Sequence, residues 1–74
     1  MAAGVTPNVH TYSSLISAYD RGGQWRAAEV VFEQMPAAGL TPNDYTYNSL
    51  ISAYAKGGQW QKAETAFMQM QAAG

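Results

Sequence analysis

Apolar side chains recur along the chain at steps of three and four residues, which places them on one face of a helix. Two such stripes, over residues 9–20 and 24–35, are followed by two more over 44–55 and 59–72. The stripes contain Val9, Tyr12, Leu15, Ile16 and Tyr19; Trp25, Ala28, Val31, Phe32 and Met35; Tyr47, Leu50, Ile51 and Tyr54; and Trp60, Ala63, Ala66, Phe67 and Met70. The pattern predicts four amphipathic helices in two antiparallel hairpins, with the tryptophans and methionines in the core.

Polar and special residues between the stripes mark the helix ends. Asn8 and Asn43 each follow a proline and can cap the first turn of a helix with the side-chain oxygen. Glycine pairs at 22–23 and 57–58 permit the positive φ that ends a helix. Pro36 lacks an N–H and clashes with the preceding turn, so the second helix should end or bend just before it.

The second half of the chain repeats the first at a spacing of 35 residues. Of the 39 aligned pairs, 26 are identical. Repetition at this spacing is typical of a solenoid, in which each unit buries its apolar face on its neighbour. We expect the tail of a preceding repeat at 1–8, a first repeat at 9–43 and a truncated second repeat at 44–74. Because Met1–Gly4 resembles the end of the first unit, the chain looks like a piece of a longer array.

Composition narrows the possible functions. The chain has 74 residues, no cysteine and a formal net charge of −1, which bounds it to one small domain without thiolate sites. The charge argues mildly against nucleic acid, since free-standing nucleic-acid modules are usually basic. Residues 1–19 are too interrupted by glycine, proline and polar residues to span a bilayer and lack the charges of a targeting segment.

Catalytic and metal-binding patterns are missing from the sequence. His10 has no second histidine or carboxylate cluster beside it, so it is not expected to bind a metal or to act as a base. Glu29 and Glu33 lie one turn apart, but their repeat counterparts are Glu64 and Met68, which favours a solvated face. No enzyme activity, cofactor or metal is predicted.

The motif Tyr-x-x-Leu-Ile-x-x-Tyr, followed by glycine, alanine, phenylalanine, methionine, glycine and Pro-Asn at these intervals, resembles the pentatricopeptide repeat. The related tetratricopeptide repeat has a period of 34 residues. The resemblance covers nearly the whole chain and implies a right-handed α-solenoid of two helix-turn-helix repeats. It also implies binding of single-stranded RNA, one base per repeat, within a parent protein that processes or stabilises RNA in a mitochondrion or chloroplast.

The resemblance assigns base reading to residues that directly follow the first tyrosine of each helix pattern and to one that closes the repeat. These are Ser13 and Asn43 for the first base and Asn48 for the second. Ser13 with Asn43 is similar to the pair that prefers adenine, and Asn48 to the choice that reads a pyrimidine. The partner that would select uracil or cytosine lies four residues beyond Gly74. Asn43 is expected to combine base reading with helix capping.

The resemblance also assigns base stacking to His10 and Tyr45 and phosphate contact to Arg21 and Lys56. The stacking position is commonly aliphatic in the family, so a histidine and a tyrosine depart from its pattern. Their rings offer faces on which a base can stack. Both cations also stand at the expected C-terminal end of a helix, where a positive charge stabilises the helix dipole. Their presence there can therefore be explained without a ligand.

Two other functions remain open at this stage. The same repeats could form a protein-binding or peptide-binding helical scaffold, which the mild acidity favours. Alternatively the chain is a structural or engineered repeat fragment without its own activity. Whatever the function, two repeats without capping helices should be marginally stable or associate end to end. If they bind RNA, two repeats alone should bind it weakly.

Overall fold

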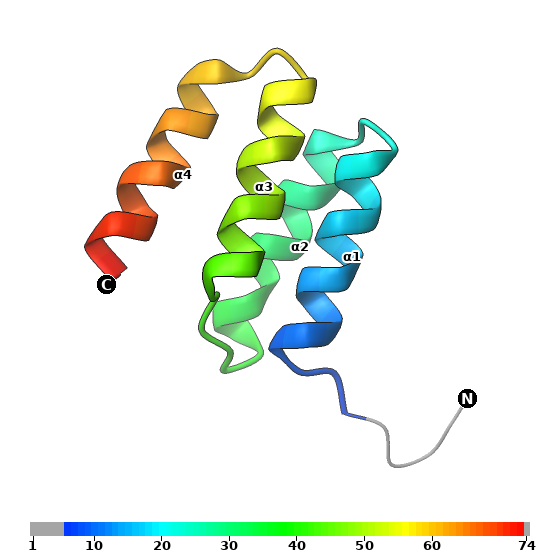
Figure 1. Cartoon of the computed structure of the whole chain (residues 1–74). Coiled ribbons are helices and arrows are strands. Elements are labelled where there is room, and N and C mark those ends of the chain that lie inside the picture. Colours follow the sequence, from blue (N-terminus) through cyan, green and yellow to red (C-terminus); the bar gives the residue numbers. More distant parts are fainter. Residues whose placement is uncertain (1–5, 74) are drawn as a thin grey trace.

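The computed structural model describes residues 6–73 and contains four α-helices joined by short turns (Figure 1). They are α1 (Val9–Arg21), α2 (Trp25–Ala37), α3 (Asp44–Lys56) and α4 (Trp60–Ala73). The described residues contain no strand, so the predicted all-α fold of helical hairpin repeats is confirmed. The segment Met1–Gly4, interpreted above as the end of a preceding repeat, lies outside the described residues.

The first helix of each hairpin begins with the same side-chain cap. The side-chain oxygen of Asn8 accepts the N–H of Thr11, and that of Asn43 accepts the N–H of Thr46, both at 3.0 Å. Each threonine hydroxyl in turn accepts the backbone N–H of its asparagine, which completes a capping box. The predicted capping role of both asparagines is therefore confirmed.

Three helices end at a glycine with positive φ. Gly23, Gly39 and Gly58 have φ of 70°, 76° and 73°. At each end the N–H of the next residue reaches back five residues; Gln24, for example, donates to the Tyr19 carbonyl at 2.9 Å. This is the Schellman arrangement, in which a left-handed residue satisfies the last carbonyls of the helix. The glycine pairs thus end α1 and α3 as predicted, and the second glycine of each pair adopts the left-handed conformation.

Pro36 lies inside α2, which corrects the expected end of that helix. The helix continues past Met35 to Ala37. Because Pro36 stands in the last turn, its missing N–H removes one bond of the helix and leaves the preceding turns intact. The helix closes immediately afterwards, where Leu40 donates to the Met35 carbonyl at 2.9 Å.

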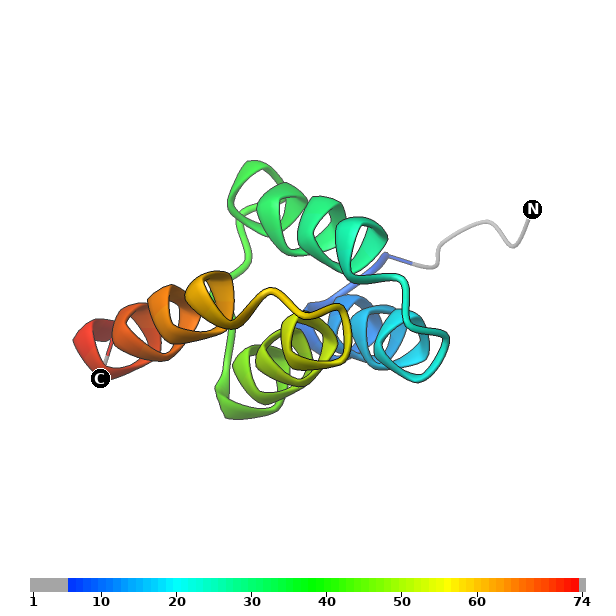
Figure 2. The same cartoon turned by 90° about the horizontal axis from the view of Figure 1, so that it is seen from above.

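The helices form two layers, visible when the molecule is seen from above (Figure 2). The helices α1 and α3 lie side by side, and α2 packs against both of them. The last helix, α4, packs against α3 and diverges from α2, so the described parts of α2 and α4 meet through side chains and not through their backbones. The face that α1 and α3 form together is consequently left uncovered on the side away from α2.

The core lies where α1, α2 and α3 meet, and the second helix of the first repeat is more deeply buried than that of the second repeat. Its buried members are Ile16, Ala28, Val31, Met35, Leu50, Ala53, Tyr54 and Ala66. Trp60 and Phe67 of α4 were predicted to face the core but are 67% and 50% exposed. Met68, the counterpart of Glu33, was expected on a solvated face and is 60% exposed. Because the backbone of α4 lies close to that of α3 and to no other described helix, its outer apolar side chains are left half or more exposed.

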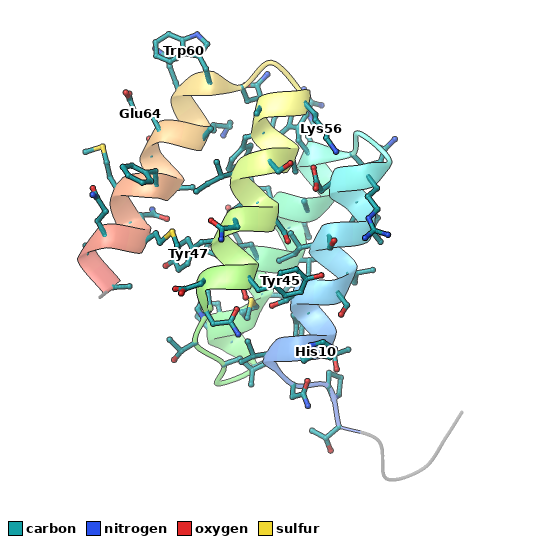
Figure 3. The ribbon with its side chains drawn as sticks, viewed as in Figure 1. His10, Tyr45, Tyr47, Lys56, Trp60 and Glu64 are labelled. Atoms are coloured by element: carbon teal, nitrogen blue, oxygen red, sulfur yellow. The ribbon has the colours of Figure 1, made fainter. Side chains whose placement is uncertain are left out.

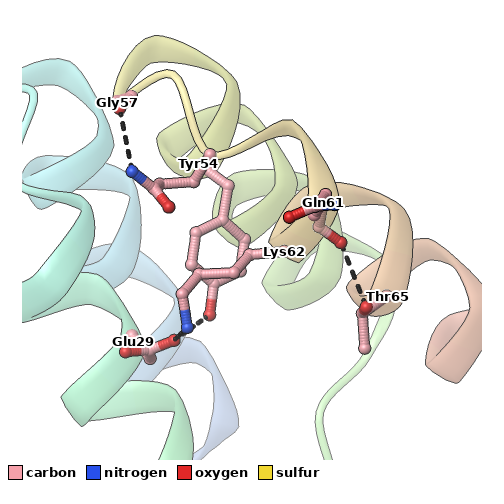
Figure 4. Close-up of polar contacts among 7 residues, drawn as sticks. Glu29, Tyr54, Gly57, Gln61, Lys62 and Thr65 are labelled. Atoms are coloured by element: carbon pink, nitrogen blue, oxygen red, sulfur yellow. Dashed lines mark hydrogen bonds and ion pairs between the residues drawn. The ribbon is translucent and has the colours of Figure 1, made fainter.

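A polar cluster of Glu29, Tyr54 and Lys62 connects α2, α3 and α4 (Figure 4). The Tyr54 hydroxyl donates to Glu29 Oε2 at 2.6 Å, and the Lys62 ammonium donates to the same oxygen at 3.1 Å. Glu29 was expected on a solvated face and is instead half-buried in this cluster. The bond from Tyr54 lowers the pKa of Glu29, while burial and then the bond to Glu29 raise the pKa of Tyr54.

These pKa changes predict a loss of stability at both ends of the pH scale. The ionised carboxylate of Glu29 contributes to the free energy of unfolding. This contribution should be lost as pH falls below the ordinary pKa of 4.5, because the unfolded chain then binds a proton more readily than the folded one. The free energy contributed by Tyr54 should be present below its ordinary pKa of 10.0 and be lost as pH rises above it. Tyr54→Phe should lower the free energy of unfolding at pH 7 by about 1 kcal/mol and remove the alkaline loss.

Urea unfolding at pH 3.5, 7 and 10.5 measures these changes. The matched control is Tyr19→Phe, since Tyr19 is the repeat counterpart of Tyr54 and its hydroxyl has no hydrogen-bond partner among the described residues. Equal effects of the two substitutions would contradict a special role for the Tyr54–Glu29 bond.

Candidate nucleic-acid interface

The two predicted stacking residues stand at the start of the helices that form the uncovered face. His10 is in the first turn of α1 and Tyr45 in the first turn of α3, and both are exposed. Figure 3 shows both side chains on the side of α1 and α3 that faces the viewer, with Tyr45 extending toward α1. Because the two residues are 35 positions apart in a repeated framework, they offer equivalent aromatic rings to the solvent on neighbouring repeats.

The two asparagines predicted to read bases are also exposed, but their environments differ. Asn43 caps α3, and its oxygen accepts from both the N–H and the hydroxyl of Thr46, at 3.0 and 2.9 Å. Its amide nitrogen has no hydrogen-bond partner among the described residues and is free to donate to a ligand. Asn48 lies on α3 with its side chain in solvent.

Ser13 does not fit the role of a direct base contact in this structure. It is completely buried between α1 and α3, and its hydroxyl is hydrogen-bonded to the Thr46 hydroxyl. The base-reading assignment of Ser13 requires an accessible hydroxyl, and the first repeat does not offer one. The reason is that α3 packs on this side of α1, and a serine is small enough to be enclosed by that contact.

Thr46 belongs to the site, although the sequence analysis did not identify it. It is completely buried and contacts both Ser13 and Asn43, the two residues assigned to the same base. Its repeat counterpart, Thr11, makes the same capping bonds but is exposed. The capping-box pattern Asn-x-x-Thr was a signal for the bond to Asn43, whereas the bond to Ser13 depends on how the helices pack.

The predicted phosphate contacts lie at the opposite end of the same two helices. Arg21 is the last residue of α1 and Lys56 the last of α3, about 16 Å along the axis from the stacking residues. Lys56 forms an ion pair with Asp20 at 3.3 Å. The paired Asp20 oxygen is buried and has no hydrogen-bond partner among the described residues, so it depends on this cation. Arg21 is exposed and forms no ion pair within residues 6–73.

The remaining chemistry of the described residues is limited. Residues 6–73 contain no group of three or more histidine, aspartate or glutamate side chains placed to hold a metal ion. No helix in this part of the chain is both long and apolar enough to cross a bilayer. What the uncovered face offers is aromatic rings for stacking, the free amide groups of Asn43 and Asn48, and cations at its far end.

Comparison with protein-family models identifies the repeats. The model of the PPR repeat family matches residues 7–56, and that of the PPR repeat matches residues 45–74. A search of curated proteins finds no matching relative. The first match spans more than half of the chain and covers α1, α2 and α3, whose hairpin arrangement agrees with the 35-residue repeat. The chain therefore belongs to the PPR repeat family.

Proposed function

We propose that the chain is a single-stranded RNA-binding module that reads one base per repeat. The observation that carries this proposal is the pair of exposed rings, His10 and Tyr45, at equivalent positions on the uncovered face. Asn43 also supports the proposal, because it lies two residues before Tyr45 in the chain and its side-chain amide nitrogen is free to donate a hydrogen bond. A base stacked between the two rings would have its polar edge within reach of a fixed donor.

PPR repeats are generally RNA-binding modules and non-enzymatic binding scaffolds, and proteins that contain them are commonly organellar. For this chain we propose a parent protein that processes or stabilises RNA in a mitochondrion or chloroplast. In that setting Asn43 would favour adenine, Asn48 would contact a pyrimidine, and Arg21 would contact the phosphate backbone. Lys56 would contribute less to phosphate binding than Arg21, because its ammonium already neutralises the carboxylate of Asp20, one oxygen of which is buried.

The affinity of two repeats alone for RNA should be low. Base stacking on aromatic side chains contributes about 1–3 kcal/mol per base, and two bases barely offset an association cost of about 4–15 kcal/mol. Binding in the high-micromolar to millimolar range is therefore expected for two repeats. A longer array of repeats would add contacts without repeating the full cost of association.

Protein or peptide binding is the second candidate function. The observation that favours it is a groove of about 380 Å³ on the side away from the RNA face. It lies between α2 and α4, has Leu50 and Tyr54 as its floor, and carries Phe32 and Lys62 on its walls. This groove and the face of α1 and α3 are separate surfaces, so a titration can tell which of them binds a ligand.

The proposed function predicts residue-specific NMR shifts. Titrating ¹⁵N-labelled protein with short A-rich, pyrimidine-rich and G-rich single-stranded RNAs at low salt should shift the amide signals of His10, Asn43, Tyr45 and Asn48 in a sequence-dependent way. Arg21 should respond to all the RNAs alike, because phosphate contacts carry no sequence information. Tyr45→Ala should weaken binding by about fivefold or more.

The control variant is Tyr47→Phe, which alters a neighbouring tyrosine that is buried rather than exposed. Shifts confined to residues of the groove, such as Phe32 and Lys62, or no shifts at millimolar RNA from a folded protein, would contradict RNA binding by the face of α1 and α3.

A further inference from the structure

The hydroxyl of Thr46 fixes the direction of a chain of hydrogen bonds. It donates to Asn43 Oδ1 at 2.9 Å, because an amide oxygen can only accept. A hydroxyl has a single proton, so Thr46 accepts from Ser13, and Ser13 is the donor of that bond. Thr46 also accepts the backbone N–H of Asn43 at 3.2 Å. The chain of bonds therefore runs from buried Ser13 through buried Thr46 to the exposed amide of Asn43.

We infer that Thr46 is a positioning residue of the base-reading site, which orients Asn43 and transmits to it the identity of Ser13. This inference rests on the proposed RNA-binding function and assigns Ser13 an indirect role in it. Two donors on the Asn43 oxygen hold that oxygen toward the protein and turn the amide nitrogen outward. Hydrogen bonds in series also polarise one another, which makes the outward N–H a stronger donor.

A fixed amide discriminates between bases, whereas a freely turning amide does not. On its Watson–Crick edge adenine has an unprotonated ring nitrogen that accepts a hydrogen bond, and uracil has an N–H at the corresponding place. When the outward amide nitrogen of Asn43 lies opposite this ring position, it donates to adenine and meets a like donor on uracil. An amide that could rotate would present its oxygen to uracil as readily. The buried bond between Ser13 and Thr46 thus sets specificity without touching the base.

The first repeat supplies a matched control for this inference. Thr11 caps Asn8 with the same bonds as Thr46, at 3.0 and 3.1 Å, but no Ser13-like hydroxyl among the described residues reaches it. Thr11→Val therefore removes a capping hydroxyl and nothing else. Thr46→Val removes the same hydroxyl together with the connection to Ser13. Ser13→Ala breaks only that connection and leaves the cap of Asn43 intact.

Measurements without RNA test whether Asn43 is positioned in this way. In ¹⁵N relaxation of side-chain amides, Asn43 should be more rigid than Asn8, and Ser13→Ala or Thr46→Val should raise the mobility of Asn43 alone. Thr46→Ser keeps the hydroxyl and should restore the rigidity, and Thr11→Val should affect only Asn8. Urea unfolding of each variant shows that it is folded. An Asn43 amide that is as mobile as that of Asn8, or indifferent to Ser13→Ala, would overturn the inference.

Measurements with RNA test the consequence for specificity. The probes are two five-nucleotide RNAs in which cytosines flank a central adenine or a central uracil. The wild-type protein should prefer adenine, and Ser13→Ala and Thr46→Val should reduce the ratio of the two affinities by about two- to tenfold, while Thr46→Ser and Thr11→Val preserve it. An equal loss with Thr11→Val would overturn the inference. If neither RNA binds the wild-type protein, the proposed function fails, and the side-chain relaxation still decides whether Thr46 positions Asn43.

Discussion

Leu50→Ala should lower the free energy of unfolding by about 2–5 kcal/mol, whereas Leu15→Ala should lower it by less than about 1 kcal/mol. The two leucines are the same residue at the same place in the repeat, 35 positions apart. Leu50 is 1% exposed, and Leu15 is 43% exposed. The contrast arises because α3 packs against α1, α2 and α4, while α1 packs against α2 and α3 only within residues 6–73.

The cost of Leu50→Ala has two parts. One is the lost transfer of apolar surface out of water, and the other is the cavity that remains when the surrounding helices relax only partly. A chain of this length is expected to have a total free energy of unfolding of about 4–11 kcal/mol. The upper part of the predicted loss would leave a large fraction of the variant unfolded at room temperature when the total lies near the lower end of this range.

Far-UV circular dichroism during urea unfolding measures both variants. Leu50→Met is a useful third variant, because it roughly conserves side-chain volume and should lose less than about 1.5 kcal/mol. Equal losses for Leu15→Ala and Leu50→Ala would mean that the outer face of α1 is covered in solution, as end-to-end association of two chains would do.

Local features of the fold could be predicted from the sequence because they depend on neighbours in the chain. The caps at Asn8 and Asn43 and the left-handed glycines at 23 and 58 are properties of a single turn of backbone. The helical stripes likewise follow from the spacing of apolar residues. The end of α2 was placed too early, since a proline in the last turn of a helix disturbs it far less than one in the middle.

Features that depend on packing between repeats could not be predicted, because the repeats are nearly identical while their surroundings are not. Ser13 on α1 and its counterpart Asn48 on α3 occupy the same position in the repeat. The packing of α3 buries Ser13, whereas Asn48 is exposed. Trp25 is partly buried against the core, while its counterpart Trp60 is exposed. The bond between Ser13 and Thr46 joins residues 33 positions apart, so no local pattern indicated it.

Gly57→Ala should lower the free energy of unfolding by about 1–3 kcal/mol, although alanine suits the backbone there. Gly57 has negative φ, so its conformation does not require glycine. An added Cβ would, however, lie 2.1 Å from Cδ1 and 2.7 Å from Cγ of Trp25. These atoms are at the base of the indole ring, so the whole side chain would have to move.

Moving Trp25 would disturb several contacts at once. Its ring packs against Tyr54 with centroids 5.9 Å apart, and the Lys62 ammonium lies 5.6 Å from the ring centroid. Both partners belong to the cluster around Glu29 that connects α2 to α3 and α4. The added methyl group would therefore strain the junction between the two repeats rather than a single turn.

Two control variants isolate this steric cause in urea unfolding experiments. Gly22→Ala changes the counterpart of Gly57, where the nearest atom to an added Cβ is 3.6 Å away, so it should be neutral or stabilise the fold by about 0.4–1 kcal/mol. In the background of Trp25→Ala, Gly57→Ala should lose most of its cost, because the clashing ring is gone and the two effects are coupled. An unchanged cost in that background would show that Gly57 is needed for some reason other than its contact with Trp25. The close approach of Trp25 to Gly57 would then not be the cause of the lost stability.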